Sequence, residues 1–332
     1  MSEQDPLERP RLGLRRILLV SGGALLVSGV ILVPGTGLLQ GVAPTTDLRV
    51  PPSASAELST DTAAGGPVVD GSARASSAPR PLLPVYWVGD AGNRDGLFRE
   101  YLEAPATSTG DPIADAVLKM TSREPLDPDY RSLWQPASSV SSSISTRNVI
   151  TIDLSSDALA EQLDEDEARL ALQQLVFTAT AAAAHAGLIT GGESSSVVVL
   201  VDGESGYRAF GAVELRGEWT RDTSVLAPVW IIDPQEGVET DTSGFTVHGQ
   251  GPAEQQEVTW RVDRVPAGVA SAEAPDATAG APFDEGTAEI STADGAEGAY
   301  TFTLQLPPGG YEITVSAPDA GGASDSKTIQ VR

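Results

Sequence analysis

The sequence contains no cysteine, and only two histidines and two lysines occur among its 332 residues. Without cysteine the chain can form no disulfide and can carry no lipid on an N-terminal cysteine. Two histidines also leave little for a zinc site or a Ser-His-Asp triad. The folded parts must therefore be held together by hydrophobic cores, for which a hydrophobic content of 40% is sufficient.

Positive charge is scarce throughout the sequence, which has 46 acidic against 21 basic residues. The first 43 residues hold three of the acids and four arginines, so the rest carries 43 acids and 17 bases. Such a surface repels phosphate backbones, which are bound through clustered lysine and arginine. We therefore expect no nucleic-acid binding.

One long stretch has no charged residue at all, at residues 17–39. As a helix it would be about 34 Å long at ~1.5 Å per residue, enough for a hydrocarbon core of about 30 Å. The preceding arginines place residues 1–16 in the cytoplasm by the positive-inside rule. The sequence thus predicts a single-pass protein of the cell membrane, with its C-terminal domains outside the cytoplasm.

A cleaved signal peptide is the alternative interpretation of this stretch, because small residues at 41–43 resemble a cleavage site. Pro44 just after the cut and the length of the apolar run argue against cleavage. Either interpretation exports the remainder. Residues 40–82 follow, rich in Pro, Ser, Ala and Gly and without aromatic residues, which predicts a flexible linker.

Residues 83–222 alternate between strand and helix patterns, which predicts an α+β domain with one sheet and two helices. Asp111 and Pro112 suit the cap and first turn of a helix that ends before Pro125. A second helix is expected over about 164–184. Residues 127–145 are expected to be irregular, and the list of expected strands is 82–88, 97–102, 148–154, 196–201 and 207–215.

Several motifs in this region occur in an order and spacing that resembles the GerMN domain of sporulation and spore-germination proteins. They are VYW at 85–87, DPIADAVL at 111–118, VITIDLSS at 149–156, the helix at 167–179 and VLVDG at 199–203. The resemblance implies a role in sporulation, germination or wall assembly, without a defined reaction.

Residues 226–332 lose the helical period and show about seven short alternating runs, which predicts an antiparallel β-sandwich. Residues 265–286 are expected to form an exposed loop. The region resembles the immunoglobulin-like domain that follows many GerMN domains. The matching segments are VWIIDPQEG at 229–237, VTWRV at 258–262, YTFTL at 300–304, LPPGGY at 306–311 and KTI at 327–329.

No motif for catalysis, a metal or a cofactor emerges from this sequence, so we predict none of the three. Calcium-loop, phosphate-loop and dinucleotide patterns are missing, and nothing singles out a carboxylate pair among the acids. The leading hypothesis is a non-enzymatic binding or scaffolding protein, whose partner is an envelope protein or a peptidoglycan component. The alternatives are a cell-wall hydrolase or accessory lytic factor, and a subunit that forms rings or filaments through an exposed sheet edge.

Tyr130, Arg131 and Trp134 are the candidate partner-binding residues, because these residue types dominate binding hot spots and lie in the expected loop. Arg131 would suit a partner that carries a carboxylate. The alternative is structural: Trp134 would pin the loop to the core, and Arg131 would pair with a neighbouring acid.

Overall fold

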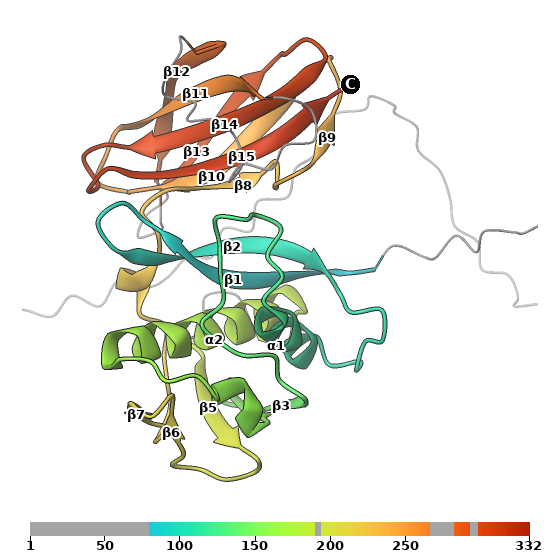
Figure 1. Ribbon diagram of the computed structural model, residues 1–332, viewed down its shortest axis with the longest axis vertical. Helices are drawn as coiled ribbons and strands as arrows, with labels where there is room; N and C mark the ends of the chain where they lie inside the picture. The colour runs from blue at the N-terminus through green and yellow to red at the C-terminus, as the bar shows by residue number, and fades with distance from the viewer. Residues whose placement is uncertain (1–79, 190–193, 266–281, 293–297) are drawn as a thin grey trace, which may run out of the picture. The chain divides into compact units, whose positions relative to one another are not determined.

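The computed structural model describes residues 80–189, 194–265, 282–292 and 298–332 (Figure 1). These described residues belong to one compact unit of the chain. The expected cytoplasmic tail, the transmembrane helix at 17–39 and almost all of the expected linker lie outside them. No helix among the described residues is long and apolar enough to cross a membrane. The membrane topology therefore stays a prediction.

Both expected helices are present, and each begins with the cap that the sequence indicates. In α1 (Pro112–Ser122), a carboxylate oxygen of Asp111 accepts the N–H groups of residues 113 and 114 at 3.0 and 3.1 Å. α2 (Glu165–His185) begins with a capping box between Asp164 and Glu167. These side chains satisfy N–H groups that the first helical turn leaves without partners.

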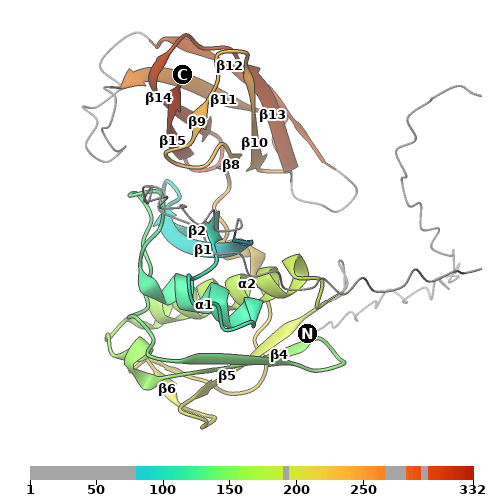
Figure 2. The ribbon, with the colours of Figure 1, turned by 90° about the vertical axis from the view of Figure 1, so that its right-hand side faces the viewer.

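Strands of the α+β region (residues 80–228) form two main sheets and not the single sheet that was expected. β1 (Leu82–Asp90) and β2 (Asp95–Glu103) form an antiparallel hairpin. β3 (Val140–Ile144), β4 (Val149–Leu154) and β5 (Ser196–Val201) form the other sheet, with β4 and β5 parallel. The two helices lie between these sheets (Figure 2).

Two details of this region differ from the expectation. β3 lies inside the segment predicted to be irregular, because its serine-rich sequence carries little strand signal. The single strand expected at 207–215 is a small hairpin of β6 (Arg208–Ala209) and β7 (Val213–Glu214). Left-handed backbone at Phe210 and Gly211 turns the chain between them.

The β region (residues 229–332) is a single curled mixed sheet of eight strands, in the order β8-β10-β13-β12-β11-β14-β15-β9. The strands are β8 (Trp230–Asp233), β9 (Glu239–Thr240), β10 (Phe245–Gly251), β11 (Glu257–Val265), β12 (Asp284–Ser291), β13 (Gly298–Leu304), β14 (Gly309–Ala317) and β15 (Ala323–Val331).

The sequence predicts an antiparallel β-sandwich, which has two separate sheets, whereas these strands are connected in one sheet. β12 pairs with β11 along Asp284–Glu289 and with β13 at Ile290 and Ser291, so it joins the two halves. β9 runs parallel to β15. The sheet curls until its halves face each other (Figure 2), and side chains from both halves share one hydrophobic core. β11 and β12 extend into the expected 265–286 loop, of which residues 266–281 lie outside the described residues.

Candidate functional site

A buried lysine joins the two regions. Lys327 on β15 is only 2% exposed, although lysine is almost never buried without a partner. Its ammonium group donates to Asp127 at 2.5 Å, to the hydroxyl of Tyr130 at 2.7 Å and to Asp325 at 3.2 Å. Asp127 and Tyr130 belong to the loop that follows α1, so this lysine bonds the α+β region to the β region.

Asp325 bonds the same loop to two strands of the β region. Its carboxylate accepts the hydroxyl of Tyr130 at 2.6 Å and the backbone N–H of Ile231 at 2.7 Å. Ile231 lies on β8, at the opposite end of the sheet order from β15. The contact therefore helps to close the curled sheet as well as to join the two regions.

Glu100 on β2 contacts the loop that follows α1 and is also only 2% exposed. Its two carboxylate oxygens accept the N–H groups of Leu126 and Asp127 at 2.9 and 2.8 Å. Burial raises the pKa of Glu100 to about 7, although these hydrogen bonds and Lys327 oppose the shift. Burial likewise raises the pKa of Asp325. We call Glu100, Asp127, Tyr130, Asp325 and Lys327 the junction cluster.

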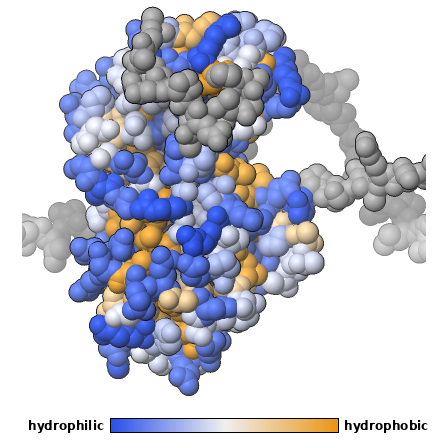
Figure 3. Space-filling model, viewed as in Figure 1, coloured by the Kyte–Doolittle hydropathy of each residue, from blue (hydrophilic) through white to orange (hydrophobic). Residues whose placement is uncertain are grey.

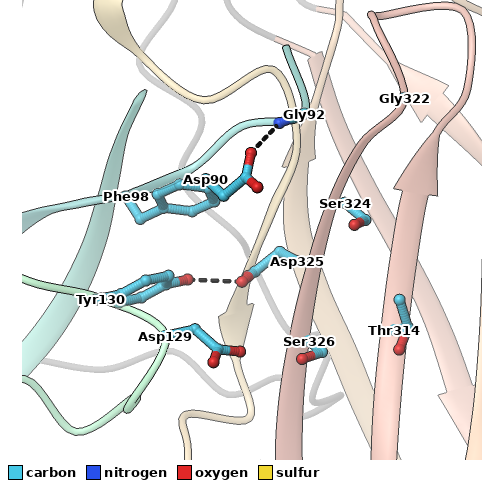
Figure 4. Close-up of a pocket in the computed structure, with 10 residues that line it drawn as sticks. All are labelled: Asp90, Gly92, Phe98, Asp129, Tyr130, Thr314, Gly322, Ser324, Asp325 and Ser326. Atoms are coloured by element: carbon cyan, nitrogen blue, oxygen red, sulfur yellow. Dashed lines mark hydrogen bonds between the residues drawn. The ribbon is translucent and has the colours of Figure 1, made fainter. Parts of the chain in front are cut away.

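A cavity of about 610 Å³ opens beside the junction cluster, between the β1–β2 hairpin, the loop after α1 and strands β14 and β15 (Figure 4). Its size is in the range typical of small-molecule sites. Carboxylates, hydroxyls and a pair of stacked rings line it, the rings of Phe98 and Tyr130 with centroids 4.8 Å apart. The lining residues are Asp90, Gly92, Phe98, Asp129, Tyr130, Thr314, Gly322, Ser324, Asp325 and Ser326.

The lining of this cavity offers carboxylates and hydroxyls as hydrogen-bonding groups. Neither histidine lines it, since His185 ends α2 and His248 lies exposed on β10. Across the described ranges, no group of three or more His, Cys, Asp or Glu side chains could hold a metal ion. Buried titratable groups with shifted pKa values mark functional sites more often than other surfaces do. Asp325 is such a group in this lining, because burial raises its pKa. Asp129 is exposed, and partial desolvation together with the charge of Asp127 raises its pKa as well.

The structure separates the three residues predicted to bind a partner. Trp134 is fully buried, and its indole N–H donates to the carbonyl of Ala171 at 2.9 Å. Tyr130 is buried in the junction cluster, where one side of it faces the cavity. The side chain of Arg131 is exposed and forms a salt bridge with the carboxylate of Asp95. The three do not form one exposed surface, so a partner role at this loop stays a prediction, and Arg131 is its accessible member.

Asp325 and Lys327 were not among the residues predicted from the sequence. One signal could have found them: both lie on the same buried face of β15 as Ile329 and Val331, at every second position. A charged pair in the core phase of a strand implies buried partners elsewhere in the chain. Asp127 and Tyr130, about 200 positions earlier, have no sequence feature that names them as those partners.

Comparison with known protein families identifies the first region. Residues 84–206 match the family model Germane, described as sporulation and spore germination. These residues form a GerMN domain. The match confirms the resemblance of this region, and the GerMN family is not generally known as catalytic. The matched residues include the loop after α1, Glu100 and the residues that line one wall of the cavity.

Similarity to solved structures is weak. The tandem GerMN domains of the sporulation protein GerM from Bacillus subtilis share 15% identity with a TM-score of 0.33, over 44% of this chain. This chain spans about half of that structure, 47%. An engineered protein shares 16% identity, with a TM-score of 0.23, over 49% of this chain and 36% of its own. The ZIG-8–RIG-5 IG1–IG1 heterodimer shares 15% sequence identity, with a TM-score of 0.19, over 30% of this chain and 84% of the matched chain. No curated protein sequence matches the chain.

Proposed function

We propose that this protein is a non-enzymatic binding or scaffolding module of the bacterial envelope, related to sporulation and germination proteins. The observation that carries the proposal is the GerMN domain, whose junction with the β region contains a polar cavity of about 610 Å³. The β region serves in this proposal as an immunoglobulin-like companion domain that supplies the second wall.

The construction of the cavity supports binding more than catalysis. Side chains from both regions line it, and the buried contacts of Asp325 and Lys327 hold its walls in place. A site held rigid before binding loses less conformational entropy when a ligand arrives. On the face shown in Figure 3, hydrophilic residues predominate, with patches of apolar residues between them.

The proposed location follows from the N-terminal sequence. Arginines before an uncharged run of 23 residues favour a cytoplasmic N-terminus, with the cavity outside the membrane. At ~5–6 Å × √n, a flexible linker of about 40 residues would extend roughly 35 Å on average. The partner in this proposal is an envelope protein or a component of peptidoglycan within that reach.

Blocking the cavity tests this proposal. Ser324 lines the cavity and is exposed, so Ser324→Trp should fill the space without disturbing a core. The control is Ser291→Trp, which puts the same ring on an exposed position of β12 outside the lining. Full-length protein and both variants serve as bait in crosslinked native envelopes, and captured components are identified by mass spectrometry.

We expect the wild type and Ser291→Trp to capture one envelope component in equal amounts. Ser324→Trp should capture at least tenfold less of it, at an unchanged melting temperature. Equal capture by both variants would contradict binding at the cavity. Release of muropeptides from purified wall, abolished by one carboxylate substitution, would instead establish the hydrolase alternative.

A further inference from the structure

The junction cluster holds more negative than positive charge. Three carboxyl groups, on Glu100, Asp127 and Asp325, surround the single ammonium of Lys327, and each of these residues is at most 6% exposed. An uncompensated charge away from water is costly, and a protein commonly avoids the cost by keeping the group protonated. The geometry therefore requires at least one of the three carboxyls to hold a proton readily.

Contacts within the cluster decide which carboxyl that is. Asp127 is bonded to the Lys327 ammonium and also accepts the N–H of Asp129 at 2.9 Å. Asp325 is bonded to the same ammonium, to Tyr130 and to a backbone N–H. Glu100 accepts two backbone N–H groups, and no salt bridge places a cation on it within the described residues.

Charged groups around the cluster add to its excess of negative charge. Asp129 lies on the same loop, and the charge of Glu312 on β14 raises its pKa. Glu236 follows β8 and accepts the N–H of Thr328, the residue after Lys327. Burial raises the pKa of Glu236 to about 7 as well. The positive charge of Lys327 opposes the raised pKa values of Glu100, Asp129, Glu236 and Asp325.

We propose that the junction cluster is a proton-binding site, with the proton on Glu100, and that losing this proton loosens the hold of the β region on the GerMN domain. Glu100 bonds to the N–H of Asp127, and the carboxylate of Asp127 bonds to Lys327 of β15. A negative charge on Glu100 repels the nearby carboxylate of Asp127, whose contact with Lys327 joins the two regions. The inference extends beyond the proposed function, because it concerns regulation of the junction whichever partner binds.

The direction of the effect follows from linkage. A carboxyl whose pKa is about 7 in the folded state and 4.5 in an unfolded one binds its proton more tightly when folded. Stability of the junction is then greatest in mild acid and falls as the pH rises from about 4.5 to about 7. The pKa of Lys327 is also raised, since Asp325 and Asp127 outweigh its burial, so the ammonium stays charged over this range.

Hydrogen exchange on the full-length protein in detergent tests the proposal, because it reports local opening of each segment. Protection of the amides in residues 126–134 and 323–331 is measured from pH 5.5 to 8.0 and corrected for intrinsic exchange. The variants are Glu100→Gln, which keeps the shape without the titration, and Glu103→Gln, an exposed control on the same strand.

We expect corrected protection in the wild type and in Glu103→Gln to fall about tenfold or more across this range. The fall should be several-fold smaller in Glu100→Gln, in which Glu236 still titrates near pH 7. Equal pH dependence in Glu100→Gln and the wild type would overturn the proposal. Should Glu100→Gln fail to fold, a carbon-13 titration of the Glu100 carboxyl in the wild type decides. A midpoint near 7 supports the proposal and one near the ordinary value of 4.5 contradicts it.

Discussion

Individual residues show where sequence patterns predict burial and where they do not. The sequence allows Trp134 to be either a partner contact or an anchor for its loop, and its buried indole has the position of an anchor. Its residue type alone predicts that Lys327 is exposed on the surface. Its burial follows from three partners, of which Asp127 and Tyr130 come from the distant loop. Residue type predicts a preference for burial, but the pairing of distant charges depends on the tertiary fold.

Removal of the buried ammonium should destabilise the protein. Lys327→Met keeps the length of the side chain but leaves the carboxylates of Asp127 and Asp325 without their cation. We expect a loss of about 3–5 kcal/mol in the free energy of unfolding at pH 7, measured by urea denaturation. The control is the other lysine: Lys119→Met on α1 should stay within about 0.5 kcal/mol. Equal effects of the two substitutions would contradict a structural role for the buried charge.

Secondary-structure elements with local signals could be predicted, and those that depend on distant contacts could not. Asp111 with Pro112 and the capping box at Asp164 mark the starts of both helices. β3 has only a weak alternation of its own, and it forms because it pairs with β4 and contacts the start of α1. β12 similarly depends on β11 and β13 on either side of it.

Asp111 has a second role at the edge of the β3 sheet, and this role gives a prediction. Its other carboxylate oxygen accepts the N–H of Ser142 on β3 at 3.1 Å and the hydroxyl at 2.7 Å. Asp111→Ala should therefore lose both a helix cap and a contact on an edge strand, roughly 2 kcal/mol by thermal or urea unfolding. Asp164→Ala loses only the cap of α2, about 1 kcal/mol. A loss for Asp111→Ala no greater than that for Asp164→Ala would show that the edge contact contributes nothing.

The same contact bears on the alternative of a ring- or filament-forming subunit. A free strand edge presents unpaired N–H groups that can pair with another chain. On the β3 edge, Asp111 accepts one such N–H group, that of Ser142. On the β5 edge, Trp219 and Val197 exchange two backbone hydrogen bonds at 2.8 Å. Both edges of this sheet are thus partly covered, which favours a binding role over edge-to-edge assembly.

At the scale of the whole molecule, the hydrophobic patterns of the sequence predict an α+β region before a β region, but not how the two regions meet. Each has its own hydrophobic core, as the change of periodicity in the sequence suggested. Their meeting point combines residues 90–130 with residues 314–326, and no periodicity within either segment indicates the other. The cavity and the junction cluster are therefore properties of the tertiary structure, visible only once both regions are placed together.

The central claim is that the cavity at this junction is where an envelope partner binds. Its most direct test is a photo-crosslinking amino acid placed at Ser326, inside the cavity, in the full-length protein in living cells. The same probe at Ser291, outside the lining, is the control. We predict one dominant crosslinked envelope component from position 326 that is missing from position 291. Identical crosslinks from both positions, or none from 326 in a correctly folded protein, would contradict the claim.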